Sequence, residues 1–303
     1  MLRPMRIGFI GLGVMGEPMC RNLVARSGEN VTVFDLQTEP MQRLVADGAV
    51  AAASVAELVA GSDLVLLSLP GGEQLAQVMA GPDGVLDVID RVGGNGRRIV
   101  DHTTAPVPLT RDLAARCRSL GVGYCDAPIA RTRQAAIDGT LSIMVGGSDS
   151  DVAAITPVLN HMASDITHCG GPGAGQITKL LNNMMLFQNV RAIAEAHAIA
   201  AGLNEQYPAD LDLDIDTVFE VIAGASGGSF ALRNHGFKAI LADDFPLQAF
   251  STEYALKDLR YAIELAEEVG VDVVGARTVG ELLEATRDAG HADEYFPVLR
   301  RMF

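Results

Sequence analysis

Six consecutive residues near the start of the chain combine glycine with apolar residues in a pattern that leaves the backbone open to a phosphate group. They are Gly11, Leu12, Gly13, Val14, Met15 and Gly16, which follow the apolar run 7–10 and precede a helical stretch at 18–25. In such a strand, turn and helix, the first glycine permits the tight turn, the second lets a pyrophosphate approach, and the third allows close packing. Unpaired N–H groups at the start of the helix face the phosphates. The segment therefore predicts a dinucleotide-binding site.

A carboxylate at the end of the second expected strand favours one of the two nicotinamide cofactors. Asp35 lies about twenty residues beyond Gly16, where an acidic side chain accepts hydrogen bonds from the ribose hydroxyls. The same charge repels a 2′-phosphate, and no arginine follows in residues 36–38, although Arg43 lies on the next helix. NAD is therefore the expected cofactor, and NADP is disfavoured.

The first half of the chain has the alternation that a parallel sheet flanked by helices requires. From Met5 to about Cys169, short β-type runs alternate with helical stretches, and several runs are apolar throughout. The expected fold class is α/β, with an N-terminal Rossmann-type parallel sheet. The expected strands are Arg6–Ile10, Val31–Phe34, Ala49–Ala51, Leu64–Ser68, Arg98–Asp101, Gly123–Asp126, Ser142–Val145 and Asp165–His168.

A dense cluster of glycine and proline at Cys169–Gly175 ends this alternation. We therefore expect an NAD-binding Rossmann domain at residues 1–172 and an all-α C-terminal domain at residues 173–303. An apolar pattern predicts a long interdomain helix from Gln176 to about Ala201, with Gly202 as its end. Because this helix is apolar nearly all round, we expect it to be buried, in part by a dimer interface. Further helices are expected at Ile215–Ala223, Ala249–Gly270, Val273–Ala289 and Asp293–Arg300.

Composition narrows the possible partners and the cellular setting. The 303-residue chain has a formal net charge of −15 and a pI near 4.7, so it offers no broad basic face to nucleic acid. No apolar stretch approaches the roughly 18 residues that suggest a membrane span. The cysteines have no CxxC spacing and the histidines no HxxxH pattern, which indicates no metal site and a reducing, cytoplasmic setting. A homodimer or homotetramer is expected.

Several ordered motifs, covering nearly the whole chain, resemble the β-hydroxyacid dehydrogenase family. This family includes 3-hydroxyisobutyrate dehydrogenases, tartronate semialdehyde reductases and glyoxylate reductases. The motifs are Gly8–Met19, Ser68–Pro70, Asp101–Thr104, Asp126–Pro128, Gly139–Leu141, Gly173–Asn183 and Lys257–Leu259. The resemblance implies an NAD(P)-dependent oxidoreductase that acts on CH–OH groups, with a small anionic hydroxy acid or semialdehyde as substrate.

Carried over position by position, the family's catalytic lysine falls on Lys179 and its substrate-orienting asparagine on Asn183. The two are four residues apart on a predicted helix, so both side chains project from one face, just beyond the expected domain boundary where a cleft would lie. The resulting hypothesis is hydride transfer between a substrate carbinol carbon and nicotinamide C4, with Lys179 moving the hydroxyl proton. A free lysine has a pKa of about 10.4, so this role requires burial or neighbouring positive charge.

The resemblance also assigns residues around this pair. It places Leu69 and Pro70 along the dinucleotide and Thr104 near the nicotinamide. The resemblance places Lys257, on a later helix, next to the cofactor. It places Phe250 and Asp258 next to the substrate.

The sequence departs from the family pattern at the loop that holds the substrate carboxylate. Where the family usually has Ser-Gly-Gly, this chain has Ala130-Arg131-Thr132. A guanidinium has fixed donors suited to bidentate binding of an anion, so Arg131 and Thr132 are the candidates for the substrate anion site. The Arg-Thr pair is similar to the branch that contains sulfolactaldehyde reductase and to succinic semialdehyde reductases. A carboxylate and a sulfonate both remain open as the bound group.

Two readings of a different kind share this architecture. An imine reductase usually replaces the lysine with an acid or a tyrosine, and a non-catalytic NAD-binding protein has lost the lysine. Lys179 argues against both. Turnover with hydroxy acids distinguishes an enzyme from a binding protein, which shows only thermal stabilisation by the cofactor.

Overall fold

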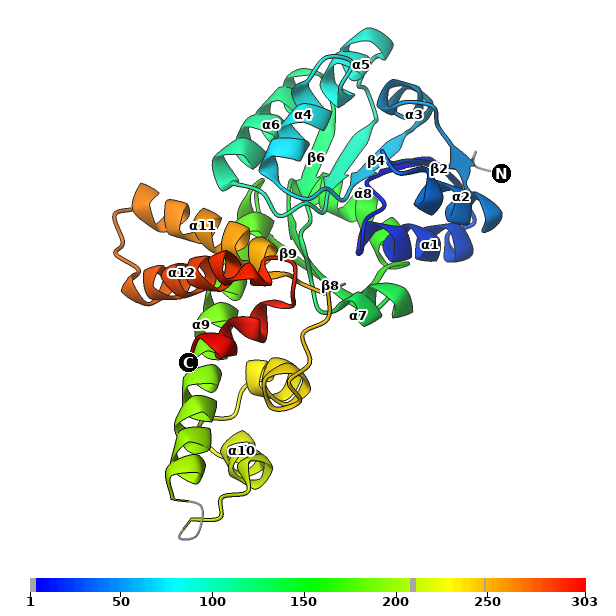
Figure 1. Ribbon diagram of the computed structural model, residues 1–303. Helices are drawn as coiled ribbons and strands as arrows, with labels where there is room; N and C mark the ends of the chain where they lie inside the picture. The colour runs from blue at the N-terminus through cyan, green and yellow to red at the C-terminus, as the bar shows by residue number, and fades with distance from the viewer. Residues whose placement is uncertain (1–3, 208–210, 248) are drawn as a thin grey trace. The chain divides into compact units, whose positions relative to one another are not determined.

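The computed structural model describes residues 4–207, 211–247 and 249–303. The chain separates into two compact units, Met1–Lys179 and Leu180–Phe303. The division falls inside a single helix, α9 (Ala174–Gln206), which Figure 1 draws as one continuous element. The connection between the units is therefore helical.

A mixed, mostly parallel sheet forms the centre of the first unit. In the described residues it has nine strands in the order β3-β2-β1-β4-β5-β6-β8-β7, with β9 paired to β8. Strand β8 is antiparallel to β6 and β7, and the other pairs are parallel. The strands are β1 Arg6–Ile10, β2 Asn30–Phe34, β3 Val50–Ala51, β4 Leu64–Leu67, β5 Arg98–Asp101, β6 Gly123–Asp126, β7 Ile129–Ala130, β8 Leu141–Gly146 and β9 Ala163–Gly170. The expected α/β class is confirmed, although β7 is too short to show any periodicity in the sequence.

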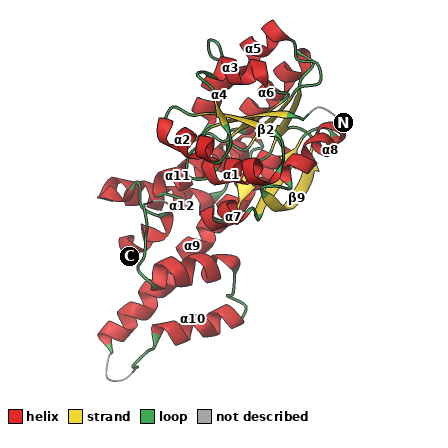
Figure 2. Ribbon diagram, turned by 90° about the vertical axis from the view of Figure 1, so that its right-hand side faces the viewer, coloured by secondary structure: helices red, strands yellow, loops and turns green. Residues whose placement is uncertain are grey.

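Helices cover both faces of this sheet. Along β4, Leu64 and Leu66 pack toward α1, α2, α7 and α8, while Val65 and Leu67 pack toward α3, α4, α5 and α6. Figures 1 and 2 show α3 to α6 together on one side of the sheet. The fully apolar strands in the sequence are explained by this double cover. The helices are α1 Gly16–Arg26, α2 Thr38–Ala46, α3 Val55–Gly61, α4 Gly72–Ala80, α5 Val85–Val92, α6 Val107–Ser119, α7 Arg133–Asp138 and α8 Asp149–Leu159.

The order of the strands determines where a ligand can bind. Strand β1 lies between β2 and β4. The chain therefore adds β2 and β3 next to β1 in one direction along the sheet and then adds β4 next to β1 in the other direction. In open α/β sheets, ligands bind outside the carboxyl ends of the strands at such a switch point. The loops after β1, β2, β4 and β5 all leave this edge, which we call the carboxyl edge.

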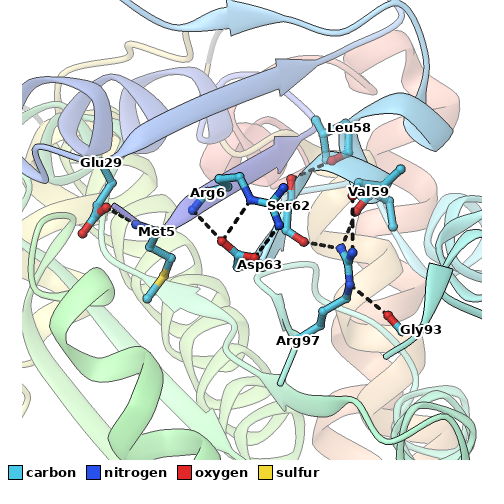
Figure 3. Close-up of polar contacts among 10 residues, drawn as sticks. Met5, Arg6, Glu29, Leu58, Val59, Ser62, Asp63, Gly93 and Arg97 are labelled. Carbon is cyan, nitrogen blue, oxygen red and sulfur yellow. Dashed lines mark hydrogen bonds and ion pairs between the residues drawn. The ribbon is translucent and has the colours of Figure 1, made fainter. Parts of the chain in front are cut away.

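The opposite edge of the sheet, which we call the amino edge, is held by two arginines (Figure 3). Arg6 donates from its side chain to both Asp63 oxygens, at 3.1 and 2.6 Å. Arg97 donates to the carbonyl oxygens of Val59 at 2.8 Å and Gly93 at 3.0 Å, which belong to the last turns of α3 and α5. These bonds connect the starts of β1, β4 and β5 with the ends of two covering helices.

The described part of the second unit is helical, as predicted. Its core contains the fully buried rings of Phe187, Phe219 and Phe296. One element, the π-helix η1, has no counterpart in the predicted set because His235 and Gly236 interrupt its apolar pattern. No helix in the described ranges is long and apolar enough to cross a membrane. After α9, the elements are α10 Ile215–Gly224, η1 Leu232–Leu241, α11 Thr252–Glu268, α12 Val274–Thr286, η2 Arg287–His291 and η3 Phe296–Met302.

One prediction about α9 is wrong. The helix continues through Gly202 to Gln206, because the Asn204 side chain binds the Leu213 backbone through both its amide groups, at 3.1 and 3.0 Å, and so anchors the last turns. Within one chain the helix is not buried all round, and its burial in part by a dimer interface stays a prediction. Met185 is 61% exposed and Ile199 is 64% exposed, so α9 presents apolar side chains to its surroundings.

Candidate active site

The loop between β1 and α1 has the geometry that the three glycines predict. Gly11 has φ +92°, and a side chain there would lie 2.3 Å from the Ser68 carbonyl oxygen. A side chain on Gly16 would lie 2.1 Å from the Gly11 carbonyl oxygen, so helix and turn touch at this point. Gly13, in contrast, has no atom within 4 Å of its missing side chain. The first and last glycines serve packing, and the middle one borders open space, so its contact with a phosphate stays a prediction.

Asp35 is fixed next to this loop. The residue directly follows β2, and its Oδ2 accepts the Leu12 N–H at 2.6 Å while its Oδ1 accepts the Gln37 N–H at 2.8 Å. Leu12 is buried, whereas Val14 is exposed and Met15 is half-buried. The carboxylate therefore lies at the glycine loop with its orientation set by two backbone groups.

The nearby arginine on α2 is already bound to a carboxylate. Arg43 Nε and Nη2 donate to the two oxygens of Glu17, each at 2.8 Å. This pairing with Arg43 lowers the pKa of Glu17, against the opposing effect of burial. Arg43 therefore forms a bidentate ion pair between α1 and α2.

The loops that follow β4 and β5 are tied to each other at the carboxyl edge. The Leu69 N–H donates to Thr103 Oγ1 at 3.1 Å. Thr104 is half-buried and Pro70 is exposed. In the first unit, the structure thus brings together the glycine loop, Asp35 and the loops that carry Leu69 and Thr104 at one edge of the sheet.

Two polar residues directly beneath these loops are fully enclosed. Asp101 accepts the Thr103 N–H at 2.9 Å and the Tyr124 hydroxyl at 3.0 Å, and burial raises its pKa to about 7. His102 Nδ1 lies 2.7 Å from the Ala127 carbonyl oxygen, and burial lowers the pKa of His102 to about 4. The carbonyl acts only as an acceptor, so Nδ1 carries the proton and His102 is neutral. The loop after β5 therefore begins on a buried polar base.

Lys179 lies on the second turn of α9 and is half-buried. The helix begins directly after β9, and its first turn is bonded to Asp126 at the end of β6. Asp126 accepts the Gly173 N–H at 2.7 Å and the Gln176 N–H at 2.9 Å. The residue that the sequence singles out as the acid–base group is therefore close in the chain to a rigid attachment point.

In the second unit, Asn183 belongs to a buried polar cluster. Its Nδ2 donates to Asp258 Oδ2 at 2.8 Å, and its Oδ1 accepts from Asn182 Nδ2 at 3.1 Å. Lys257 Nζ donates to the other Asp258 oxygen at 2.8 Å and lies over the rings of Tyr254 and Tyr261, at 5.8 and 5.1 Å from their centroids. Asp258 is 2% exposed. The structure thus brings Asn183, Lys257 and Asp258 into one bonded set.

Phe250 lies beside the aromatic core of the same unit. Its ring stacks on Phe187 at 6.0 Å between centroids and meets the edge of Phe296 at 5.9 Å. A further ring, Tyr254, stacks on it at 6.3 Å and connects it to Lys257. Phe250 is therefore held rigidly near the polar cluster of Asn183.

Arg131 lies in a different environment from the one predicted for a free anion receptor. Its backbone has φ +84°, a conformation that glycine favours and that the family's glycine would adopt without strain. Its guanidinium donates to the Thr140 carbonyl oxygen at 2.5 Å and to Ser164 Oγ at 2.8 Å, and it is ion-paired with Asp165. Thr132, at the N-cap of α7, makes no side-chain capping bond. The role of both residues in substrate binding stays a prediction.

The structural roles of Asp126 and Gln176 were not predicted from the sequence. Asp126 and Gly173 are 47 residues apart, and nothing local indicates that the end of β6 meets the start of α9. Among the described residues, no group of three or more His, Cys, Asp or Glu side chains could hold a metal ion.

Comparison with known proteins adds to this geometry. The family model described as the NAD binding domain of 6-phosphogluconate dehydrogenase matches residues 6–171. The model described as NAD-binding of NADP-dependent 3-hydroxyisobutyrate dehydrogenase matches residues 173–301. The chain belongs to the β-hydroxyacid dehydrogenase family. This assignment confirms the expectation of an NAD(P)-dependent oxidoreductase that acts on CH–OH groups.

Individual members of the family match over nearly the whole chain. The 2-(hydroxymethyl)glutarate dehydrogenase of Eubacterium barkeri is 34% identical over 290 residues, which cover 96% of this chain and 92% of that protein. The 3-sulfolactaldehyde reductase of Escherichia coli K12 is 31% identical over 94% of this chain and 91% of its own length. A solved structure of Mycobacterium tuberculosis 3-hydroxyisobutyrate dehydrogenase with L-serine has a TM-score of 0.86 and 32% identity, covering 99% of each chain. This β-hydroxyacid dehydrogenase is thus similar in sequence and fold to enzymes of hydroxy acids and semialdehydes.

Proposed function

We propose that Lys179 carries out the acid–base chemistry of a 3-hydroxyacid dehydrogenase or semialdehyde reductase and that Asn183 orients the substrate. The observation that carries this proposal is the Asn183 amide, which is 3% exposed and hydrogen-bonded on both of its sides. It lies four residues after Lys179 on the same helix. Its two hydrogen bonds fix the orientation of the amide beside the position of Lys179 in the chain.

The proposed chemistry divides the work between the cofactor and this chain. When bound, the nicotinamide accepts a hydride from the substrate carbinol carbon or returns it in the reverse direction. During oxidation, Lys179 Nζ takes the proton of the substrate hydroxyl. During reduction, its ammonium form gives a proton to the carbonyl oxygen. The glycine loop, with open space at Gly13, and the Asp35 carboxylate are the residues that would hold the dinucleotide.

The bonds of Asn183 limit what it can offer to a substrate. A carboxylate only accepts hydrogen bonds, so the end of the Asn183 amide that faces Asp258 must be its NH₂ group. Its carbonyl oxygen accepts from Asn182. These two bonds use the carbonyl oxygen and one N–H, and we propose that Asn183 donates its other N–H to an oxygen of the substrate.

We propose NAD as the preferred cofactor, on two contacts near the ribose site. Asp35 places a negative charge where NADP carries its 2′-phosphate. Arg43, the one nearby cation that the sequence offered to that phosphate, is held by both oxygens of Glu17. Binding of a 2′-phosphate by Arg43 would require breaking this bidentate pair.

For the substrate we propose a small anionic hydroxy acid or semialdehyde. Sulfolactaldehyde or succinic semialdehyde is a second candidate, favoured by Arg131 and Thr132 and by the likeness to the Escherichia coli 3-sulfolactaldehyde reductase. For Arg131 to bind the substrate anion, its guanidinium has to leave or share the Asp165 carboxylate. Steady-state rates on a panel of carboxylate and sulfonate substrates, with wild type and Arg131→Met, test this. Loss of anion selectivity in the variant supports the role of Arg131, and unchanged selectivity contradicts it.

The decisive experiment replaces the lysine. We expect Lys179→Ala to lower turnover by about 10²- to 10⁴-fold, the usual contribution of general acid–base catalysis. Thermal stabilisation by NAD should persist, because the glycine loop is untouched. Lys238→Ala is the matched control, since Lys238 is an exposed lysine bonded to Asn234. Normal turnover by Lys179→Ala contradicts the proposed function.

We also propose that the enzyme is a homodimer or homotetramer assembled through α9. Leu181, Met185 and Ile199 are 44%, 61% and 64% exposed on this helix, and a second copy of the chain would cover them. Light scattering should show a lower mass for the double variant Met185→Lys with Ile199→Lys. Glu205→Lys, an exposed change on the same helix, should leave the mass unchanged. An unaltered mass in the double variant overturns this assembly.

The cysteines support a cytoplasmic location, which we propose on this basis. All four thiols are free, and Cys20, Cys117 and Cys125 are buried in the first unit. Burial raises the pKa of Cys117 and of Cys125 to about 12 and that of Cys20 further. Cys169 is half-buried. Reduced thiols of this kind are typical of a reducing compartment.

A further inference from the structure

Asp126 is a buried carboxylate that the proposed chemistry does not use. It ends β6 and has no exposed surface. Its Oδ1 accepts the Gly173 N–H at 2.7 Å, and its Oδ2 accepts the Gln176 N–H at 2.9 Å. The first N–H groups of a helix have no partner within the helix and lie at its positive end, so a carboxylate stabilises them. Asp126 thus attaches the start of α9 to the sheet.

The surrounding backbone fits closely around this carboxylate. A side chain on Gly175 would lie 2.3 Å from the Met144 carbonyl oxygen and 2.8 Å from Asp126 Oδ2. A side chain on Gly146 would lie 2.5 Å from Asp126 Oδ1. Because both positions lack a Cβ atom, α9 begins in direct contact with the ends of β6 and β8. The first turn of the helix therefore has little freedom to shift.

Gln176 connects the same turn to a second element. Its side chain is fully buried, Nε2 donates to the Thr103 carbonyl oxygen at 2.6 Å, and Oε1 accepts the Ala105 N–H at 3.2 Å. The two bonds span the loop that carries Thr104. One bond uses the side chain as a donor and the other uses it as an acceptor, and the glutamine amide supplies both functions.

Lys179 follows Gln176 by three residues on α9. Residues three apart lie on the same side of a helix, about one turn along. A displacement of the first turn therefore moves the lysine by a similar amount. Reaction rates respond strongly to such displacements, because a misplacement of about 1 Å can cost about 100-fold.

We propose that Asp126 and Gln176 are positioning residues for the acid–base lysine. Together they hold the start of α9 against the end of β6 and against the loop of Thr104, which sets the location of the Lys179 ammonium. Neither side chain takes part in proton transfer. This inference rests on the proposed function of Lys179.

The test compares each substitution in two backgrounds. Asp126→Asn keeps the shape of the side chain but turns one acceptor into a donor that faces a backbone N–H. Gln176→Met keeps the length of the side chain and removes both bonds. In the wild-type background, we expect each variant to lower kcat by about 10- to 100-fold, with the Kd for NAD close to that of wild type. In the Lys179→Ala background, each should change the residual rate little, because residues that act through one group are not additive.

The controls separate positioning from general destabilisation. Asp63→Asn makes the same chemical change at the amino edge, where it breaks the ion pair with Arg6, and should leave kcat unchanged. An equal loss in both backgrounds overturns the inference while the role of Lys179 stands. Full activity of Lys179→Ala instead overturns the proposed function. If Asp126→Asn does not fold, Gln176→Met decides the outcome in the same way.

Discussion

At the amino edge of the sheet, the guanidinium groups of Arg6 and Arg97 are occupied by a carboxylate and by backbone carbonyl oxygens. At the carboxyl edge, three carboxyl groups act as hydrogen-bond acceptors instead. Asp35, Asp101 and Asp126 each accept backbone N–H groups. Both sets of side chains are bonded within the chain, but the amino edge uses side-chain donors and the carboxyl edge uses side-chain acceptors.

The difference shows how one sheet separates stability from binding. Cations at the amino edge neutralise the carbonyl oxygens at the ends of α3 and α5, and an open pocket there is lined by arginines that already have partners. Carboxyl groups at the carboxyl edge accept backbone N–H groups, and Gly13 leaves unfilled space near Asp35. The amino edge therefore contributes to the stability of the fold, while the carboxyl edge fixes the loops that carry the proposed cofactor-binding residues.

The largest effect that tests this comparison is the pH dependence introduced by Asp101. Burial raises the pKa of Asp101 from 3.8 to about 7, so between these values the folded state holds a proton that the unfolded state has released. The free energy of unfolding should therefore fall as the pH rises through this interval, by about 4 kcal/mol in total. Urea titrations of wild type and Asp101→Asn between pH 4 and 8 measure the difference.

Comparing wild type with Asp101→Asn separates the effect of Asp101 on the free energy of unfolding from the effect of the buried histidines. Burial lowers the pKa of His102 and His235 to about 4, so their contribution to stability rises with pH between about 4 and 6.5. That contribution is present in both proteins and cancels. Tyr124→Phe, which removes a donor to the ionised carboxylate, should extend the interval to higher pH. Parallel curves for wild type and Asp101→Asn would falsify the prediction.

The second prediction concerns the open space at the carboxyl edge. Gly13→Val adds atoms where no other atom lies within 4 Å, so the fold should keep its thermal midpoint. The added side chain should block the pyrophosphate and weaken NAD binding by about 100-fold. Isothermal titration measures the affinity. The matched variant Gly16→Ala should lower the thermal midpoint instead, because its side chain meets the Gly11 carbonyl oxygen. Tight NAD binding by Gly13→Val argues against this site.

The third prediction concerns the amino edge. Arg97→Met removes the donors to the carbonyl oxygens of Val59, Ser62 and Gly93. We expect a loss of about 2 kcal/mol in the free energy of unfolding, because charged donors contribute strongly to buried carbonyl groups. The kcat and KM values should not change. Arg97→Lys should recover part of the stability. A kinetic defect in Arg97→Met would show that the two edges are not independent.

The smallest expected effect concerns cofactor choice. Asp35→Ser removes the charge beside the ribose site, and the ratio of kcat/KM for NADP to that for NAD should rise about tenfold, or about 1.4 kcal/mol. Glu39→Ser removes an exposed charge on the following helix and serves as the control. An unchanged ratio in Asp35→Ser would mean that this carboxylate does not discriminate between cofactors with and without a 2′-phosphate.

The features that were predicted correctly depend on residues close together in the sequence. The glycine loop needs only six residues and the strand before it, and the alternating elements follow from runs of four to eight apolar residues. The end of α9 was missed because it depends on Asn204 bonding to Leu213 after the helix, and a glycine at 202 resembles a stop signal.

The candidate site shows the same limit for side chains. Resemblance to a family brought Lys179, Asn183, Lys257 and Asp258 forward, and the structure joins the last three in one cluster. The partner of Arg131, however, is Asp165, which lies 34 residues further along the chain. Sequence patterns reveal a charge but not its distant partner, which is why the pairing of Arg131 was not predicted.

The buried cysteines give this protein an intrinsic probe of its own opening. Cys20 lies on α1, Cys117 on α6 and Cys125 on β6, so they sample both helical layers and the sheet between them. A thiol reacts as its thiolate, and only when a reagent can reach it. An added reagent should therefore modify Cys169 first, and the other three only at the rate at which helices separate from the sheet. Labelling kinetics followed by mass spectrometry would time those motions without any engineered label.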